Sequence, residues 1–583
     1  MISLAALVLI AAPAPVAPHP DPSQSPAAAQ EGRFALTTAP QSFDPLHADA
    51  TANQVLQRQV YEGLVEYAPG GPEAGIQGLL AASWEASADG LRWRFTLRED
   101  ARFHDPAEDP LWEGGSRPVF AQDFVESWLR MADPRQGPRG YWAFEGLILG
   151  LDEFRDACSA SDAEAEQAWQ TAREDGVAGL KALGPRTLEL RLHRADPWFL
   201  NRLASPYFVA YPAEAVARAG AEFLNQPVGS GPYWLQSWTP GSGAILERVP
   251  SWRGQTLPDG RPAASIERLR FRYVAEGSTR TLLFEQGEID RLPPLQDAFA
   301  RLMPNGELSE ELQERGVVLH QVDVPDLSML CFNMLDEAVG EIPGDAAGNR
   351  QRRLLRQAVA LAFPYERWHR VIRNGSWGLP ARGFLPPALP DAADTADCPY
   401  RREDHEAARA KLAEAGWPAG RGAPQLKLDL GGTDPVNLAI GEMFREAMAE
   451  IGLEVLVVPN SWAELSTKMR NGEAQIFLRA WTLDWADPVN LLEIFHGAHL
   501  APGINRCNYV DPGYDRDLDA LRNQPAELRG PLLARAVERL NEDLPAIPID
   551  HRKGYLLVQP WLLGVQVHPF DPFPCKYYAL GPR

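Results

Sequence analysis

Between residues 425 and 481, segments with strand spacing and segments with helix spacing alternate along the chain. Residues 425–430 (QLKLDL) and 453–458 (LEVLVV) have the apolar pattern of strands. The intervening residues 437–451 place apolar side chains three and four positions apart, which is typical of one face of a helix. A strand, a helix and a strand in this order predict a right-handed βαβ unit with parallel strands.

The alternation continues on both sides of this unit. A helix is expected at residues 461–469 and a strand at 475–481, so we predict an α/β lobe over about residues 325–550. Closer to the amino terminus, residues 91–97 and 187–193 alternate apolar and polar side chains as half-buried strands do. The whole chain of 583 residues therefore predicts a mixed α/β protein with more than one structural unit.

The charge balance is strongly acidic. Asp and Glu number 78 against 56 Lys and Arg, which gives a formal net charge of -22. A field of this sign repels nucleic acid and anionic lipid, so neither is an expected partner. No apolar run of transmembrane length follows the amino-terminal residues, and together with the charge this favours a soluble monomer.

The amino-terminal residues differ from the rest. Residues 2–12 (ISLAALVLIAA) form an apolar run that is too short to span a bilayer and is typical of a secretory signal. Residues 13–30 are rich in Pro and Ala and cannot pack a core. We therefore expect residues 1–30 to be a signal peptide and leader of an exported, periplasmic protein. No Cys follows the apolar run, so a lipoprotein anchor is not expected; a mis-assigned start or a buried strand is the alternative reading.

Enzyme motifs are missing from the sequence. It contains no G-x-S-x-G elbow, no Walker A sequence, no G-x-G-x-x-G and no H-E-x-x-H. His496 and His499 form the only close histidine pair, and no third ligand stands at metal-site spacing. The five scattered cysteines are not a disulfide framework, although one or two bridges remain open. We therefore expect no catalytic residues, no metal and no cofactor.

A series of different short motifs follows in order along the chain from about residue 33 onward. They include residues 42–46 (SFDPL), 60–65 (VYEGLV), 89–98 (DGLRWRFTLR), 121–125 (AQDFV), 229–233 (GSGPY), 286–290 (QGEID) and 481–491 (WTLDWADPVNL). As an ordered series they resemble extracytoplasmic solute-binding protein family 5, the oligopeptide- and dipeptide-binding proteins of ABC importers.

The resemblance implies a fold and a function. The fold is α/β, the two-lobed periplasmic-binding-protein fold of the large peptide-binding type, with three regions and a hinge. The expected boundaries are residues 31–72, 205–325 and 555–583 for lobe I, 73–204 for an extra region packed on lobe I, and 326–554 for lobe II. The implied function is capture of short peptides in the periplasm and delivery to an ABC permease in the inner membrane, without enzymatic activity.

Two aspartates in the last motif are given different roles. Asp484 is similar in position to the aspartate that pairs with the ligand α-amino group in oligopeptide binders. An enclosed ammonium group needs a buried carboxylate in place of the water it has lost. Asp487 precedes Pro488 and a helix, so we interpret it as an N-cap with Pro at N1. A plain loop or cap aspartate is the alternative for Asp484.

Two segments match those that pair with the peptide backbone in the family, residues 49–52 and 479–481. Such pairing resembles addition of a strand to a sheet and reads no side chains, so it permits broad specificity. Asp49, Thr51 and Ala480 are therefore candidate ligand contacts. A plain loop and a core strand are equally acceptable interpretations of the two segments.

Four larger side chains are further candidates. In some relatives an arginine just before this Trp meets a ligand carboxylate, so the resemblance makes Arg479 a candidate for that role, with a structural or solvated arginine as an equal alternative. Trp481, Tyr141 and Trp142 offer large, rigid surfaces for side-chain pockets, whereas core packing is the alternative for each.

Other functions compatible with the sequence remain. The same fold binds cell-wall peptides, sugars, opines, haem or nickel complexes in relatives, so a non-peptide ligand is the main alternative. A sensory protein that presents its ligand to a membrane receptor is a weaker one. A secreted enzyme is the least supported, because no motif favours it.

Overall fold

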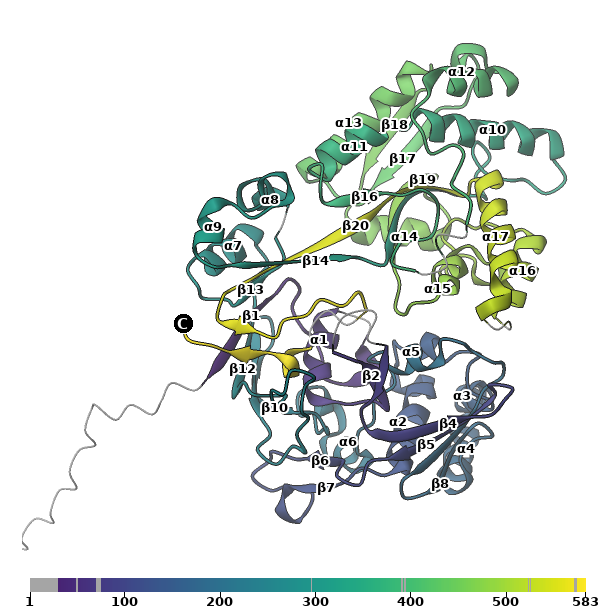
Figure 1. Ribbon diagram of the computed structural model, residues 1–583. Helices are drawn as coiled ribbons and strands as arrows, with labels where there is room; N and C mark the ends of the chain where they lie inside the picture. The colour runs from purple at the N-terminus through teal and green to yellow at the C-terminus, as the bar shows by residue number, and fades with distance from the viewer. Residues whose placement is uncertain are drawn as a thin grey trace, which may run out of the picture.

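A computed structural model describes residues 30–48, 51–69, 75–294, 296–389, 392, 395–522, 524, 526–570 and 574–583. The predicted signal peptide and leader lie outside these ranges except for Gln30, and so does Asp49. The described chain forms two lobes connected by two long strands, β14 (Val318–Asp323) and β20 (Ala546–Val558), which cross between them (Figure 1). The predicted two-lobed α/β fold is confirmed.

Lobe I is built on a four-stranded sheet in the order β1-β12-β11-β10. Its strands are β1 (Glu31–Leu36), β10 (Tyr233–Thr239), β11 (Gly243–Arg248) and β12 (Arg268–Tyr273). β1 runs parallel to β12, and the other pairs are antiparallel. The helices α1 (Thr51–Val60) and α6 (Ala213–Ala219) contribute Val55, Leu56 and Ala215 to the lobe I core.

Residues 49–52 match a strand-like segment of the family, with a plain loop as the equal alternative, but from Thr51 onward the chain is helical, because α1 begins there. Val55, Leu56 and Val60 stand at helical spacing and all three are buried in the lobe I core. Burial of this apolar face stabilises a helix in place of a strand.

The extra region has its own sheet and its own hydrophobic core. The antiparallel sheet has the order β4-β5-β9-β8, with strands β4 (Ala81–Ala86), β5 (Arg92–Leu97), β8 (Leu180–Gly184) and β9 (Thr187–Arg191). Its helices are α2 (Ala121–Ala132), α3 (Leu151–Ala160) and α4 (Asp162–Asp175). Phe95 and Leu97 of β5 are buried while Arg94 and Thr96 are exposed, which confirms the predicted alternation.

Lobe II contains an eight-stranded sheet with the main order β13-β20-β15-β19-β17-β18, to which β14 and β16 add by pairing with β20. The remaining strands are β13 (Arg291–Leu292), β15 (Asp326–Phe332), β16 (Gly378–Pro380), β17 (Leu426–Leu430), β18 (Val455–Pro459) and β19 (Ile476–Thr482). Its helices are α10 (Ala346–Ala362), α11 (Tyr365–Ile372), α12 (His405–Glu414), α13 (Pro435–Glu450), α14 (Trp462–Asn471), α15 (Pro488–Leu492), α16 (Pro512–Arg522) and α17 (Ala526–Asp543). The predicted βαβ unit is confirmed as β17, α13 and β18, with β17 and β18 parallel.

Smaller elements complete the chain: β2 (Val65–Tyr67), β3 (Ile76–Gly78), β6 (Arg102–His104), β7 (Ser116–Pro118), α5 (Phe199–Leu203), α7 (Gly277–Glu285), α8 (Gln296–Leu302), α9 (Glu310–Glu314), β21 (Leu562–Leu563) and β22 (Ala579–Leu580). The expected boundary between residues 325 and 326 falls between β14 and β15, and the one between 554 and 555 falls within β20. The boundaries themselves stay predictions.

Buried ion pairs hold the hinge strands together. Asp326 at the start of β15 is fully buried and pairs with Arg552 of β20, whose side chain also donates to the Thr482 hydroxyl at 3.1 Å. Asp550 of β20 pairs with Arg373 at 2.7 Å. Burial alone would raise the pKa of Asp550, but the hydrogen bonds and charge of Arg373, together with hydrogen bonds from Trp368 and Ser328, outweigh it and lower that pKa. The crossing strand β20 is thus fixed to lobe II by charge-assisted hydrogen bonds.

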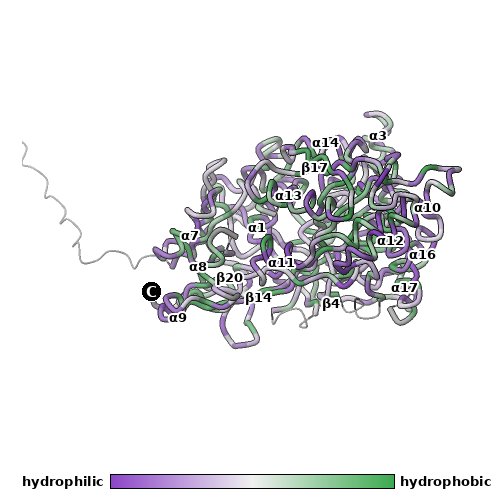
Figure 2. The backbone as a smooth tube through the Cα atoms, turned by 90° about the horizontal axis from the view of Figure 1, so that it is seen from above, coloured by the Kyte–Doolittle hydropathy of each residue, from purple (hydrophilic) through white to green (hydrophobic). Residues whose placement is uncertain are grey.

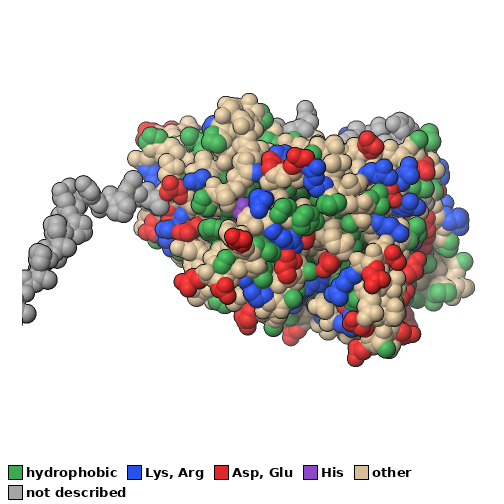
Figure 3. Space-filling model, turned by 90° about the horizontal axis from the view of Figure 1, so that it is seen from below, with side chains coloured by type: hydrophobic (Ala, Val, Ile, Leu, Met, Phe, Trp, Pro, Cys, Tyr) green, Lys and Arg blue, Asp and Glu red, His purple; other side chains and the backbone are tan. Residues whose placement is uncertain are grey.

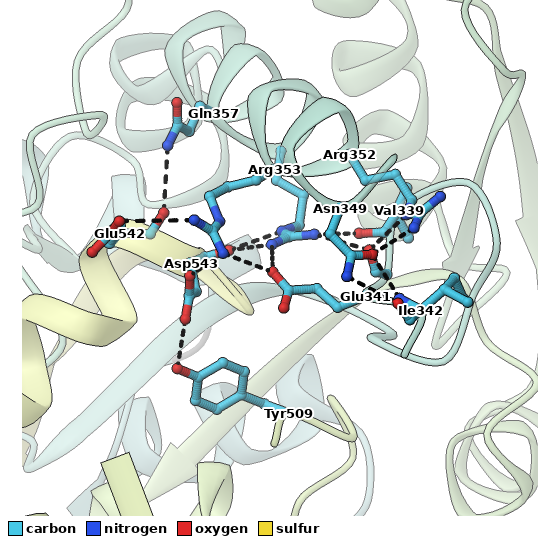
Figure 4. Close-up of polar contacts among 12 residues, drawn as sticks. Val339, Glu341, Ile342, Asn349, Arg352, Arg353, Gln357, Tyr509, Glu542 and Asp543 are labelled. Carbon is cyan, nitrogen blue, oxygen red and sulfur yellow. Dashed lines mark hydrogen bonds and ion pairs between the residues drawn. The ribbon is translucent and has the colours of Figure 1, made fainter. Parts of the chain in front are cut away.

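A fully buried arginine joins distant parts of lobe II. The Arg356 guanidinium on α10 donates to the backbone carbonyl of Asp543 at 2.6 and 2.9 Å and to that of Val339 at 2.7 Å, and it pairs with Glu341 at 3.1 Å. Burial lowers its pKa to about 10, so the side chain stays charged at neutral pH. Figure 4 shows the surrounding network, in which Arg353 also reaches Glu341 and Asp543.

The surface and the interior differ as expected for a globular protein. Hydrophobic segments run through the interior and hydrophilic segments occupy many of the outer turns (Figure 2). On the face seen in Figure 3, basic and acidic side chains are interspersed, and neither sign forms a continuous patch there. Within the described ranges, no helix combines the length and the apolar character needed to cross a bilayer.

Candidate functional site

A cavity of about 400 Å³ lies between the lobes beside the crossing strands. Lobe I, the hinge strands and lobe II all contribute to its wall. The lining residues are Gln54, Val55, Arg58, Ser205, Pro206, Tyr207, Arg291, Pro293, Val322, Val324, Thr482, Leu483, Asp484, Gly554, Tyr555, Leu556, Val567, His568, Pro569 and Phe570. Most of these side chains are apolar or aromatic, with a few polar groups among them, as in pockets that bind small organic ligands.

Among the described residues that line this cavity, Asp484 is the only one with a carboxylate. It follows β19 directly, and its backbone N–H donates to the Asn490 side chain at 3.0 Å. Burial raises the pKa of Asp484 to about 7, and a hydrogen bond from Asn490 offsets only part of this effect. Among the ion pairs of the described residues, none involves Asp484. The site therefore holds a half-buried acid for which the described part of the chain supplies no ion-pair partner.

Asp487, three residues further on, is satisfied within the fold. It caps α15 by accepting from the Val489 N–H at 3.0 Å, and Pro488 occupies the first helical position, so the predicted N-cap is confirmed. Its carboxylate also pairs with the buried Arg529 at 2.7 Å. Burial raises the pKa of Asp487, and Arg529 offsets part of the rise. The two neighbouring aspartates therefore differ in kind, because among the described residues only Asp487 has a cation as partner.

Trp485, between these aspartates, contacts the extra region across the gap between the lobes. Its ring stacks on that of Trp142 with centroids 5.6 Å apart and planes at 19°. The Arg202 guanidinium lies 4.3 Å from the centroid of the same ring, and Arg202 pairs with Asp196 at 2.8 Å. Trp142 in turn contacts the cavity residue Tyr207 edge-on at 5.3 Å. Trp485 thus contacts both an indole and a guanidinium of the other side.

The remaining candidates on β19 do not line this cavity. Arg479 donates to the Ile504 carbonyl at 2.8 Å, and its guanidinium lies 5.1 Å from the Trp481 ring centroid. Ala480 is exposed, and Trp481 packs against the lobe II core. The first two residues of β19, Ile476 and Phe477, pair with both β15 and β17, whereas the rest of the strand pairs with β15 alone among the described strands.

The last candidates lie in the extra region and lobe I. Tyr141 is buried, and its hydroxyl donates to Asp152. Burial raises the pKa of Tyr141. Asp49 lies outside the described residues, and for Thr51 the described structure is limited to its place at the start of α1. Of the eight predicted ligand contacts, the structure thus places Asp484 in the cavity wall and Trp142 in the contact with Trp485 between the lobes.

Several residues of the cavity wall were not predicted from the sequence. Tyr207 follows α5, and Val567, His568, Pro569 and Phe570 form a loop after β21. No periodic pattern marks either segment, because both are irregular and their role depends on contacts far along the chain. The aromatic and proline content of residues 567–570 was the one available signal, since such side chains on a loop favour a packed segment over a solvated one.

The five cysteines are all buried free thiols. Within the described ranges, no group of three or more His, Cys, Asp and Glu side chains is arranged to hold a metal ion.

Two lobes, crossing strands and a partly apolar cavity between them define a two-lobed ligand-binding protein. The family model described as "Bacterial extracellular solute-binding proteins, family 5 Middle" matches residues 75–499. The chain belongs to this family, which agrees with the resemblance seen in the sequence motifs.

Known relatives match over nearly the whole chain. The chain is 25% identical over 548 residues to "Heme-binding protein A" of Haemophilus influenzae, covering 92% of this chain and 90% of that protein. It is 25% identical over 542 residues to "Periplasmic oligopeptide-binding protein OppA" of Escherichia coli, covering 90% and 87%. The crystal structure of Haemophilus influenzae OppA in complex with RPPGFSPFR matches with a TM-score of 0.72 and 21% identity, over 95% of this chain and 99% of that one.

Proposed function

We propose that this protein captures short peptides with a free amino terminus between its two lobes and delivers them to an ABC permease in the inner membrane. One observation carries the proposal: Asp484 is a half-buried carboxylate in the cavity wall, and no ion pair of the described residues involves it. A ligand ammonium group supplies the missing charge. The names of relatives that bind oligopeptides, dipeptides or tripeptides support the peptide class.

Backbone recognition is the second part of the proposal. The stretch of β19 that includes Arg479, Ala480 and Trp481 pairs on one side only among the described strands, which leaves an edge that an extended peptide can join. Asp49 and Thr51 are proposed to face the ligand from lobe I, with Tyr141 and Trp142 near its side chains. Contacts to both lobes make the closed form the better binder, so the ligand draws the hinge toward closure.

The cellular setting follows from the same proposal. The apolar run at residues 2–12 and the Pro/Ala-rich residues up to 30 are proposed to direct export and then to be removed or remain as a leader. The mature protein is proposed to act as a periplasmic monomer without a cofactor and without catalytic activity.

Native mass spectrometry of the purified protein tests the ligand class. Wild-type protein is offered a library of short peptides and the same peptides with acetylated amino termini. We expect adducts of the free peptides, at least about a hundredfold weaker binding of the acetylated ones, and a similar loss for Asp484→Asn, since an unpaired buried charge costs about 3–5 kcal/mol. Asp397→Asn, which alters an exposed carboxylate of lobe II, is the matched control.

Two results contradict the proposal. Equal binding of free and acetylated peptides would remove Asp484 as the ammonium partner. A single non-peptide adduct that survives Asp484→Asn would keep the chain a solute-binding protein and replace peptides as its cargo.

A further inference from the structure

The loop Val567–Phe570 lies inside the cavity, although it belongs to the segment that returns to lobe I. This segment leaves β20, forms β21 paired with β22, and ends in lobe I with Tyr578 in the core. All four residues of the loop line the cavity wall. The return segment therefore does more than complete lobe I, because it makes a detour into the space between the lobes.

Aromatic contacts hold this loop in place. The His568 ring lies 4.4 Å from the Tyr67 ring on β2, and the Phe570 ring stacks on the same tyrosine at 6.0 Å. The Phe570 N–H donates to His568 Nδ1 at 3.1 Å, and Pro569 between them restricts the backbone. Tyr67 is itself buried in the core of the extra region. The loop is thus a fixed part of the wall.

Phe570 spans the gap between the two sides. Its ring packs against the hydrophobic core of lobe II and also against the core of the extra region. A side chain that contacts both cores narrows the passage for a peptide at this point. The remaining cavity of about 400 Å³ stands near the small end of the roughly 300–1,000 Å³ typical of ligand pockets.

We propose that the Val567–Phe570 loop closes one end of the ligand pocket and limits the peptides that this protein accepts to short ones. This inference rests on the proposed function and adds its length selectivity. The apolar wall formed by Val567, Pro569 and Phe570 with Val322 and Val324 of the hinge selects apolar side chains in those short ligands.

The test uses an equimolar mixture of free peptides of two to eight residues and compares the lengths retained by each variant. Phe570→Ala opens the end of the pocket, and His568→Ala removes the ring that packs on Tyr67 at 4.4 Å, which allows the loop and Phe570 to move out of the gap. We expect wild-type protein to retain the shortest peptides. In both variants the ratio of long to short peptides should rise by about tenfold or more. A change of this size corresponds to the binding free energy gained by burying one further apolar side chain.

Leu563→Ala is the matched control, because Leu563 lies on the same return segment, is exposed and does not line the cavity. Unfolding curves establish that each variant is folded, and His568→Ala decides the question if Phe570→Ala is not. An unchanged length profile in a folded loop variant that still binds peptides overturns the length limit alone. Absence of peptide binding by the wild type overturns the proposed function and the length limit together.

Discussion

Trp142 of the extra region and Trp485 of lobe II stack across the gap between the lobes, with ring centroids 5.6 Å apart. Trp485 adjoins Asp484, so the residue proposed to bind the ligand and the residue that joins the lobes are neighbours in the chain. Under the proposed function, one short segment therefore takes part both in closure and in ligand capture.

Removal of this stack should weaken ligand binding, although Trp142 itself does not line the cavity. We expect Trp142→Ala to lower peptide affinity by between a few-fold and about tenfold, because an aromatic pair contributes about 0.5–1.5 kcal/mol to the closed form. Calorimetric titration measures the affinity, and small-angle scattering measures the degree of closure. Trp462→Ala, at an exposed position of α14, is the control and should change neither. Unaltered affinity in Trp142→Ala would separate the stack from ligand capture.

Peptide affinity should depend on pH through Asp484. Its pKa of about 7 in the unliganded site means that protons compete with the ligand ammonium below pH 7, which lowers affinity by up to about tenfold per unit. Above about pH 8 the peptide loses its own proton, since α-amino groups titrate near 7.7–8.0. We expect affinity to be highest between these limits. Titrations from pH 5 to 9 check this, and Asp484→Asn should lose the acidic limb.

The same carboxylate should make the empty protein less stable. A carboxyl group whose pKa is raised on folding destabilises the folded state as the pH rises from its unfolded value, near 3.8, through about 7. Asp484→Asn should therefore raise the free energy of unfolding at pH 8 by roughly 1–3 kcal/mol, less than a full three-unit shift implies because the side chain is only half buried. Little difference is expected at pH 4. Urea unfolding at both values measures it, and a stabilisation that is equal at pH 4 and pH 8 would contradict this origin.

Arg356 should be among the most sensitive positions of lobe II. Arg356→Met leaves buried carbonyl groups of Val339 and Asp543 without a donor, and we expect a loss of about 3–5 kcal/mol. Arg353→Met, in the same network but partly exposed, should cost about 1 kcal/mol or less. Equilibrium unfolding in urea compares the two. Similar losses in both variants would show that burial of Arg356 does not set its importance.

Local features of the sequence predicted local features of the fold. The βαβ unit of β17, α13 and β18 was predictable because each element carries its own apolar period. The cap formed by Asp487 was predictable because it involves only the next few residues. The helix α1 was not predicted, because residues 49–52 were interpreted from the family motif and not from the helical spacing of Val55, Leu56 and Val60.

Contacts between distant segments could not be predicted in this way. Nothing near Trp142 in the sequence indicates that Trp485 stacks on it, and nothing near Phe570 indicates that it reaches the cores of lobe II and the extra region. Asp484 was identified through the ordered motifs, whereas its lack of a cation became evident only when the neighbouring side chains were placed in space.

Lobe I joins segments from both ends of the chain, and this constrains the order of folding. The ring centroids of Phe34 on β1 and Tyr578 lie 6.3 Å apart, and Glu66 forms an ion pair with Lys576. At about 5–20 residues per second, the ribosome reaches Tyr578 roughly 30–110 s after Phe34. For that interval the first strand has no finished core to enter, so the nascent chain remains unfolded in this part. An unfolded amino-terminal part is the form in which chaperones recognise a chain and export channels thread it.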